Sequence, residues 1–266
     1  MKIGIVGCAG RMGRLLVAEV LAGPGCELAG GSERPDSPAL GQDVAVLGGG
    51  QPSGLKVTDD ARALFAAADV IADFTMPAAT VFHAGLAAET GTAMVIGTTG
   101  LGPQHQAAID ILARKAAVVQ AANMSIGVNL LLGLTAQVAK ALGEEFDIEI
   151  LEMHHRHKVD APSGTALALG KAAAAGRGVD FDAVAQRARD GHTGARRRGD
   201  IGFASLRGGD VVGDHTVLFA GEGEQLALTH KATSRAVLAK GAIRAATWVA
   251  GRTPGLYSMR DVLGLA

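Results

Sequence analysis

The sequence predicts an α/β protein of two domains: a doubly wound parallel Rossmann-like sheet, and a second α+β domain with a mixed or antiparallel sheet. Three observations predict this fold. Residues 2–21 read as an apolar strand, a glycine-rich turn and an apolar helix. Strands and helices then alternate up to residue 125, which is typical of a parallel sheet. After residue 200, three strand-like segments follow one another with only short turns between them.

The glycine-rich turn, residues 7–13, joins the first strand, residues 2–6, to the first helix, residues 14–21. Its three glycines are evenly spaced, which departs from the usual G-x-G-x-x-G spacing. Glycines at such a turn allow the backbone to approach a pyrophosphate at the N-terminus of the helix. We therefore expect the turn to bind a dinucleotide cofactor through Gly7, Cys8, Ala9, Gly10, Arg11 and Met12.

The second strand, residues 27–32, ends at Glu33 and Arg34. An acid about 20 residues beyond the glycines can bond the ribose hydroxyls of the adenosine. A neighbouring arginine can pair with a 2′-phosphate. Both NADH and NADPH are therefore expected as cofactors. Because Cys8 lies beside a helix N-terminus, its thiol is expected to have a lowered pKa.

The alternation continues after a surface loop, residues 35–52, that is rich in Gly, Pro, Ser and Asp. The following pattern predicts helices at 60–67, 78–89 and 104–116, and strands at 69–75, 93–96 and 117–121. Each strand ends in small or polar residues, and ligands of such sheets bind at the carboxyl ends of the strands. The further cofactor contacts expected at these ends are Gly97, Thr98, Thr99, Ala121, Ala122, Asn123 and Met124.

The second half of the chain has a different pattern. The predicted helices are 126–142, 166–175, a short one at 183–188 and a last one at 235–250; the predicted strands are 147–152, 201–207, 211–220 and 225–231. Turns at 208–210 and 222–224 suggest hairpins between the last three strands. The basic stretch 191–199 is expected to be a solvated loop.

Composition narrows the class of protein. The chain has 266 residues, of which 48% are hydrophobic, and this is enough for one or two domains with buried cores. The formal net charge of −1 provides no electrostatic basis for binding nucleic acid or a membrane surface. No uninterrupted apolar run of about 18 residues is present. Cys8 and Cys26 have neither metal-site nor C-x-x-C spacing, which favours a reducing cytoplasm.

The chemistry of the chain is concentrated between residues 152 and 166. This stretch reads Glu-x-His-His-x-x-Lys-x-Asp-Ala-Pro-Ser-Gly-Thr-Ala. It follows a half-buried strand and leads to a helix with Ser163 as its expected N-cap. A helix N-terminus suits a carboxylate or phosphate, and His and Lys beside it suit proton transfer. From spacing alone, catalysis, metal binding and an ordinary solvated loop all stay open.

The whole stretch closely resembles the signature of the 4-hydroxy-tetrahydrodipicolinate reductase (dihydrodipicolinate reductase) family. Asp-Phe-Thr at 73–75, Gly-Thr-Thr-Gly at 97–100 and Ala-Asn-Met-Ser at 122–125 also resemble this family. The resemblance runs from residue 1 to about residue 265. It implies NAD(P)H-dependent reduction of (2S,4S)-4-hydroxy-2,3,4,5-tetrahydrodipicolinate to 2,3,4,5-tetrahydrodipicolinate with loss of water, in lysine biosynthesis through diaminopimelate.

The resemblance also implies roles for single residues. His154 corresponds to the acid/base histidine and Lys158 to the proton-donor lysine, while His155, Gly164 and Thr165 correspond to substrate-binding positions. It further implies a dinucleotide-binding domain of residues 1–125 and 235–266. The remaining part, 126–234, is expected to bind the small cyclic dicarboxylate substrate and to form a homotetramer.

Two other functions remain as alternatives. A metal-dependent hydrolase would use His154, His155 and His157, although no H-E-x-x-H spacing is present. A non-catalytic redox sensor would bind NAD(H) and a regulatory partner, and it would need a basic groove or a DNA-binding module. The reductase needs neither a metal nor a nucleic acid.

Overall fold

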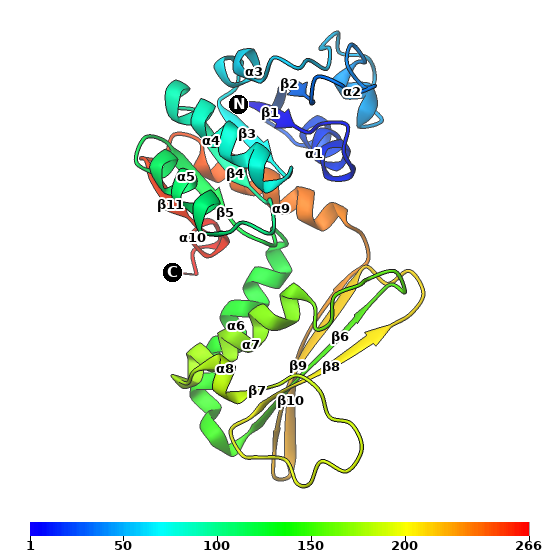
Figure 1. Ribbon diagram of the computed structural model, residues 1–266, viewed down its shortest axis with the longest axis vertical. Helices are drawn as coiled ribbons and strands as arrows, with labels where there is room; N and C mark the ends of the chain where they lie inside the picture. The colour runs from blue at the N-terminus through cyan, green and yellow to red at the C-terminus, as the bar shows by residue number, and fades with distance from the viewer. Residues whose placement is uncertain (266) are drawn as a thin grey trace. The chain divides into compact units, whose positions relative to one another are not determined.

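The computed structural model describes residues 1–265, which form two compact units. The first consists of Met1–Ile126 and the segment that begins at Ala236, and the second is Gly127–Arg235 (Figure 1). Each unit has its own sheet and its own hydrophobic core.

The first unit contains a six-stranded sheet in the order β11-β5-β4-β3-β1-β2. The strands are β1 (Lys2–Val6), β2 (Glu27–Ser32), β3 (Val70–Asp73), β4 (Ala93–Ile96), β5 (Ala117–Gln120) and β11 (Gly255–Tyr257). All neighbouring strands are parallel, which confirms the predicted doubly wound sheet. Because β2 and β3 lie on opposite sides of β1, the strand order reverses there. Ligands of such folds bind at this switch point, beyond the carboxyl ends of the strands.

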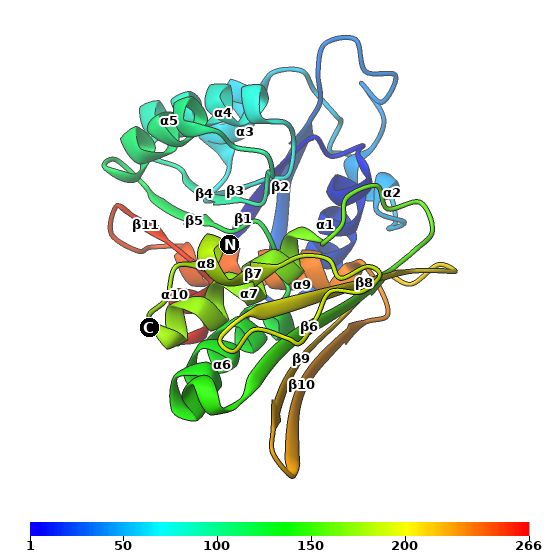
Figure 2. The same ribbon diagram turned by 60° about the horizontal axis from the view of Figure 1, so that its bottom comes forward.

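Helices cover both faces of this sheet (Figure 2). One face packs against α1 (Arg11–Ala22), α9 (Ala236–Val249) and α10 (Met259–Leu263), and the other against α3 (Ala61–Ala67), α4 (Pro77–Thr90) and α5 (Pro103–Ala113). Strand side chains alternate between the two cores: Val95 faces the first set of helices, and Met94 and Ile96 face the second. Such parallel strands are buried on both faces, which explains their apolar runs.

Some element boundaries differ from the prediction. The segment 35–52 is not only a loop, because α2 (Val44–Leu47) lies within it. The Asp43 carboxylate caps this short helix by accepting a hydrogen bond from the Ala45 N–H. Helix α1 begins at Arg11 rather than residue 14, so the turn before it is shorter than expected.

The second unit contains a five-stranded sheet in the order β10-β9-β6-β8-β7. Its strands are β6 (Asp147–His154), β7 (Ala185–Gln186), β8 (Ile201–Arg207), β9 (Gly213–Gly221) and β10 (Glu224–Ala232). Strand β6 is parallel to β8 and antiparallel to β9, which confirms a mixed sheet. The predicted β8–β9 hairpin is wrong, because β6 lies between these two strands. The helix expected at 183–188 is instead α8 (Phe181–Val184) followed by β7.

Helices α6 (Ile126–Leu142) and α7 (Gly164–Arg177) pack on one face of this sheet (Figures 1 and 2). Their Leu131 and Leu169 enter a core with Ile148 and Phe219 from the strands. The segment Ile126–Glu145, which includes a 3₁₀ turn (Gly143–Glu145), is long and apolar enough to cross a membrane by length and composition alone. Within this segment, the Leu131 and Ala139 side chains are buried in the core of this unit.

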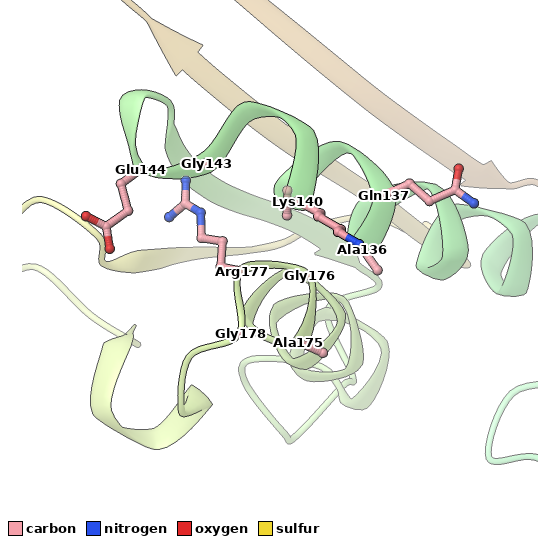
Figure 3. Close-up of a pocket in the computed structure, with 10 residues that line it drawn as sticks. Ala136, Gln137, Lys140, Gly143, Glu144, Ala175, Gly176, Arg177 and Gly178 are labelled. Atoms are coloured by element: carbon pink, nitrogen blue, oxygen red, sulfur yellow. The ribbon is translucent and has the colours of Figure 1, made fainter.

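The two helices approach closely near their C-terminal ends. A Cβ atom at Gly176 would lie 2.2 Å from the Ala136 carbonyl oxygen, so this contact requires glycine. Beside it, a cavity of about 610 Å³ is lined by residues from the last turns of both helices (Figure 3). The Arg177 guanidinium donates a hydrogen bond to the Phe146 carbonyl and thereby ties α7 to the start of β6.

Candidate functional site

The glycine-rich turn at the end of β1 has the geometry of a phosphate-binding turn. Gly7 has a φ of +67°, and a Cβ at Gly13 would lie only 2.1 Å from the Gly7 carbonyl oxygen. Gly10 is the N-cap of α1, and no side chain caps this helix. The first N–H groups of α1 and its positive dipole end are therefore suited to an anionic group of a ligand.

A cavity of about 700 Å³ lies over this turn. Gly7 and Gly10 line it together with Glu33 and Arg34, which follow β2. The Glu33 carboxylate accepts a hydrogen bond from the Ala9 N–H at 2.9 Å, which brings the acid against the turn. Apolar side chains at the end of β3 and on α4 complete the lining, namely Phe74, Met76, Ala79 and Phe82. This mixture of acid, glycine backbone and apolar surface fits the adenosine half of a dinucleotide.

The expectation of a reactive Cys8 is wrong. The side chain is fully buried, next to Gly31 and Val44. Burial raises the pKa of the Cys8 thiol to about 12, and the nearby Glu33 carboxylate adds to this effect. The turn can therefore use only the backbone of Cys8, because the thiol belongs to the core.

A buried polar network supports the ends of β3 and β4. The fully buried Asp73 carboxylate accepts hydrogen bonds from the Thr75 N–H and hydroxyl, the His83 ring and the Thr98 hydroxyl. Burial alone would raise the pKa of Asp73, but the bonds from His83 and Thr75 outweigh it and lower the pKa. The Thr98 hydroxyl also accepts a hydrogen bond from Thr80. The Thr98 side chain thus fixes the strand ends, which leaves its backbone for a ligand.

The other expected cofactor contacts follow β4 and β5 in the same unit. Thr99 and Ala122 are exposed, whereas Met124 is buried in the core. The Asn123 side chain accepts a hydrogen bond from the Ser125 N–H and shapes the turn after β5. Arg11 is exposed and Met12 half-buried in the first turn of α1.

In the second unit, β6 is longer than the predicted strand 147–152. His154 is therefore its last residue, although it was expected in the loop that follows. It lies on the same face of the strand as Glu152, and both side chains are buried. The Nδ1 atom of His154 is 2.6 Å from a carboxylate oxygen of Glu152. A Cβ at Gly213, on β9, would lie 3.0 Å from the Nε2 atom, so this glycine leaves room at that side of the ring.

Besides His154, two other residues donate hydrogen bonds to Glu152. The Arg207 guanidinium, from the end of β8, donates to its two oxygens at 2.8 and 2.9 Å. The Ser163 N–H donates at 3.2 Å. Burial alone would raise the pKa of Glu152, but hydrogen bonds, chiefly those from Arg207, lower it to about 2. The carboxylate is therefore ionised at neutral pH.

The loop after β6 returns to α7 and places the remaining candidates. The Lys158 ammonium donates to both oxygens of Asp160, at 2.7 and 2.9 Å. The ring of His155 lies 3.4 Å from the Arg235 guanidinium. Lys158 is half-buried, so it has access to solvent while Asp160 holds its position.

Ser163 is the N-cap of α7, as predicted, although the helix begins at Gly164 rather than at residue 166. The Ser163 hydroxyl accepts a hydrogen bond from the Ala166 N–H at 3.1 Å, and it also contacts the Nε2 atom of His215 at 3.0 Å. Gly164 is exposed, and nothing lies within 4 Å of the position of a Cβ atom there. Gly164 and Thr165 thus present the N-terminus of α7 in a form that suits a carboxylate.

Comparison with known proteins shows the family to which the chain belongs. The family model for the N-terminus of dihydrodipicolinate reductase matches residues 1–124, and that for its C-terminus matches residues 127–263. The chain belongs to the dihydrodipicolinate reductase family.

Individual relatives of this reductase agree. The 4-hydroxy-tetrahydrodipicolinate reductase of Methylocella silvestris is 57% identical and covers 100% of the chain and 97% of its own length. That of Ruegeria pomeroyi is 56% identical, with 99% and 98% covered. A solved dihydrodipicolinate reductase from Paenisporosarcina sp. TG-14, with dipicolinate bound, has a TM-score of 0.77 at 26% identity, with 98% of each chain covered.

Membership confirms that the chain is an NAD(P)H-dependent reductase of lysine biosynthesis through diaminopimelate. It also decides against the alternatives of a hydrolase and a redox sensor. Within residues 1–265, no three His, Cys, Asp or Glu side chains are grouped so that they could hold a metal ion.

Three residues at the His154 site of this reductase were not singled out from the sequence: Glu152, Arg207 and His215. The alternation along β6 does place Glu152 on the buried face, and a buried carboxylate requires partners. That signal was available. Arg207 and His215 come from β8 and β9, and their positions depend on a strand order that the sequence did not reveal.

Proposed function

We propose that this reductase converts (2S,4S)-4-hydroxy-2,3,4,5-tetrahydrodipicolinate to 2,3,4,5-tetrahydrodipicolinate with loss of water, using NADH or NADPH. The observation that carries the proposal is the cluster of His154, Lys158 and the N-terminus of α7 within one unit of this family's fold. A relative with bound dipicolinate supports a small cyclic dicarboxylate as the substrate.

The residues divide into proton-transfer and binding groups. The substrate's hydroxyl group must leave as water, which gives a conjugated ring. A bound nicotinamide would supply a hydride to this ring, and the resulting carbanion-like intermediate would need a proton at the neighbouring carbon. We assign that proton transfer to His154, the last residue of β6, and to Lys158, which lies in the loop after this strand. The substrate's carboxylates suit the N–H groups of Gly164 and Thr165 and the ring of His155. Asp160 keeps Lys158 in place through its ion pair.

Substitutions separate these roles. His154→Gln should lower kcat by roughly 10²–10⁴-fold with little change in KM, the usual effect of losing a general acid–base group. Thr165→Val should raise KM with less change in kcat, because it removes a substrate contact. The assay is the oxidation of NADH or NADPH, followed by absorbance, with freshly generated substrate. An unchanged kcat for His154→Gln would assign proton transfer to another group.

The cofactor site rests on Gly7, Gly10 and Glu33, which line the cavity in the first unit. Glu33 favours the ribose diol as a hydrogen-bond acceptor, and the exposed Arg34 can accommodate a 2′-phosphate. Glu33→Ala should therefore weaken the binding of NADH more than that of NADPH. Calorimetric titration with each cofactor tests this, and equal losses would place Glu33 away from the ribose.

The homotetramer is proposed to form through the open face of the second unit's sheet. Helices α6 and α7 cover one face, and no helix of the unit covers the other among the residues that the structure describes (Figure 2). Leu151 and Leu206 are 43% and 47% exposed on that open face. A second copy of the sheet would bury them. Leu151→Glu should dissociate the assembly in light scattering after gel filtration, whereas an unchanged mass would exclude this face.

The reductase is proposed to work in the cytoplasm. Both of its cysteines, Cys8 and Cys26, are free thiols, as expected of a reducing compartment. Fractionation of cells that produce the tagged enzyme tests this proposal.

A further inference from the structure

Glu152 accepts four hydrogen bonds, and its side chain is only 1% exposed. One of its oxygens accepts from the His154 ring and from Arg207, and the other accepts from Arg207 and from the Ser163 N–H. Both oxygens are thus occupied by partners within the same unit. Such a carboxylate has little freedom to rotate, and it constrains each group that donates to it.

The first consequence concerns the His154 ring. An ionised carboxylate can only accept hydrogen bonds, so the Nδ1 atom of His154 must carry a proton. In the neutral ring, the lone pair is then on Nε2. That atom faces Gly213, where the missing Cβ keeps the space clear. Glu152 thereby determines which nitrogen of His154 can take part in proton transfer.

The second consequence concerns helix α7. Glu152 holds the backbone N–H of Ser163, the residue that caps α7 and directly precedes Gly164 and Thr165. A displacement of the carboxylate would therefore move the His154 ring and the start of α7 together. Arg207 extends this link, because it also donates to the Asp160 carbonyl at 2.7 Å, in the loop that carries Lys158.

We infer that Glu152 is a positioning residue that sets the tautomer of His154 and, through Ser163, the placement of the carboxylate-binding turn. This inference rests on the proposed function for the role of both groups in turnover. The predicted tautomer is independent of that function, because it depends only on the contact between the His154 ring and the Glu152 carboxylate. Without Glu152, both kcat and KM change, whereas loss of a group that only transfers protons would affect kcat.

The test combines kinetics with nuclear magnetic resonance of histidine labelled with ¹⁵N. The chain contains eight histidines, and the His154 signal is assigned by its loss in His154→Gln. In its neutral form, the wild-type ring should be the Nδ1–H tautomer. In Glu152→Gln the ring should become a mixture of tautomers, with a raised KM. Its kcat should fall roughly 10–100-fold, by analogy with the loss of the partners that orient metal-bound histidines.

Glu149→Gln is the matched control. Like Glu152, Glu149 lies on β6 and pairs with arginine, in its case Arg189 and Arg196, but it lies on the opposite face of the sheet. The kinetics of Glu149→Gln should stay within about twofold of those of wild type, and its His154 signal should be unchanged, because Glu149 lies on the other side of the sheet from His154 and Ser163. Since Leu151 of the proposed interface shares the face of Glu149, light scattering after gel filtration checks that the assembly is intact. An Nε2–H tautomer in the wild-type enzyme would overturn the inference even if Glu152→Gln fails to fold. So would unchanged kinetics and an unchanged tautomer in a folded Glu152→Gln.

The two proposals fail in different ways. If the wild-type enzyme does not turn over the substrate, the proposed function is wrong. The tautomer of His154 in wild type and in Glu152→Gln then still decides whether Glu152 positions the ring.

Discussion

His215 should make the folded enzyme sensitive to mild acid. The ring is 4% exposed on β9 beneath the start of α7. Its Nε2 atom contacts the Ser163 hydroxyl, and its Nδ1 atom has no hydrogen-bond partner among residues 1–265. Burial lowers the pKa of His215 from 6.5 to about 4, and the nearby His154 adds to this effect.

The sign of the effect follows from proton binding. Between pH 6.5 and pH 4, the unfolded chain binds a proton at this histidine and the folded chain does not. The free energy of unfolding therefore falls as the pH falls through this window. At pH 5, which lies 1.5 units below the unfolded pKa, the free energy of unfolding is lower than at neutral pH by an amount on the order of 2 kcal/mol. Glu152 changes the free energy of unfolding only at lower pH, because the stability that its lowered pKa provides is lost as the pH falls from 4.5 toward 2.

The assay is urea unfolding followed by circular dichroism at pH 7.5 and pH 5, at one protein concentration. His215→Gln cannot titrate, so its loss of stability between the two pH values should be about 2 kcal/mol smaller than that of wild type. The exposed His192 provides the control, and His192→Gln should behave as wild type. Equal pH dependence in wild type and His215→Gln would show that the buried ring is protonated in the folded state.

Three further outcomes follow from buried positions. Gly13→Ala should weaken NADH binding at least tenfold in calorimetric titration, because its Cβ would meet the Gly7 carbonyl oxygen at 2.1 Å; unchanged affinity would show that the turn can relax. Iodoacetamide should modify the half-buried Cys26 well before the buried Cys8, as read by mass spectrometry, and the reverse order would contradict the raised pKa of Cys8. Phe219→Ala should lower the free energy of unfolding by about 3–5 kcal/mol in urea, because it empties a fully buried position; a loss under 1 kcal/mol would mean that the core refills the space.

Local patterns were enough for much of the fold. The first unit's strands are short apolar runs between turns, and the parallel sheet follows from their alternation with helices. The same reasoning located the glycine turn, and the fold places Glu33 against it. These features depend on residues that are close in sequence. The motif at 152–166 was sufficient for the family, because a long and specific string carries more information than periodicity.

The sequence by itself thus determined the fold class, the family and the stretch that contains His154 and Lys158. Only the tertiary structure decided what surrounds them. Strand β6 lies between β8 and β9. Arg207 therefore contacts Glu152, and His215 contacts Ser163, although each pair is more than 50 residues apart in the sequence. Burial likewise reversed the expected pKa of Cys8, because desolvation of the thiol outweighs its favourable place beside a helix N-terminus. Strand order and burial arise from contacts between distant segments, and no local pattern encodes them.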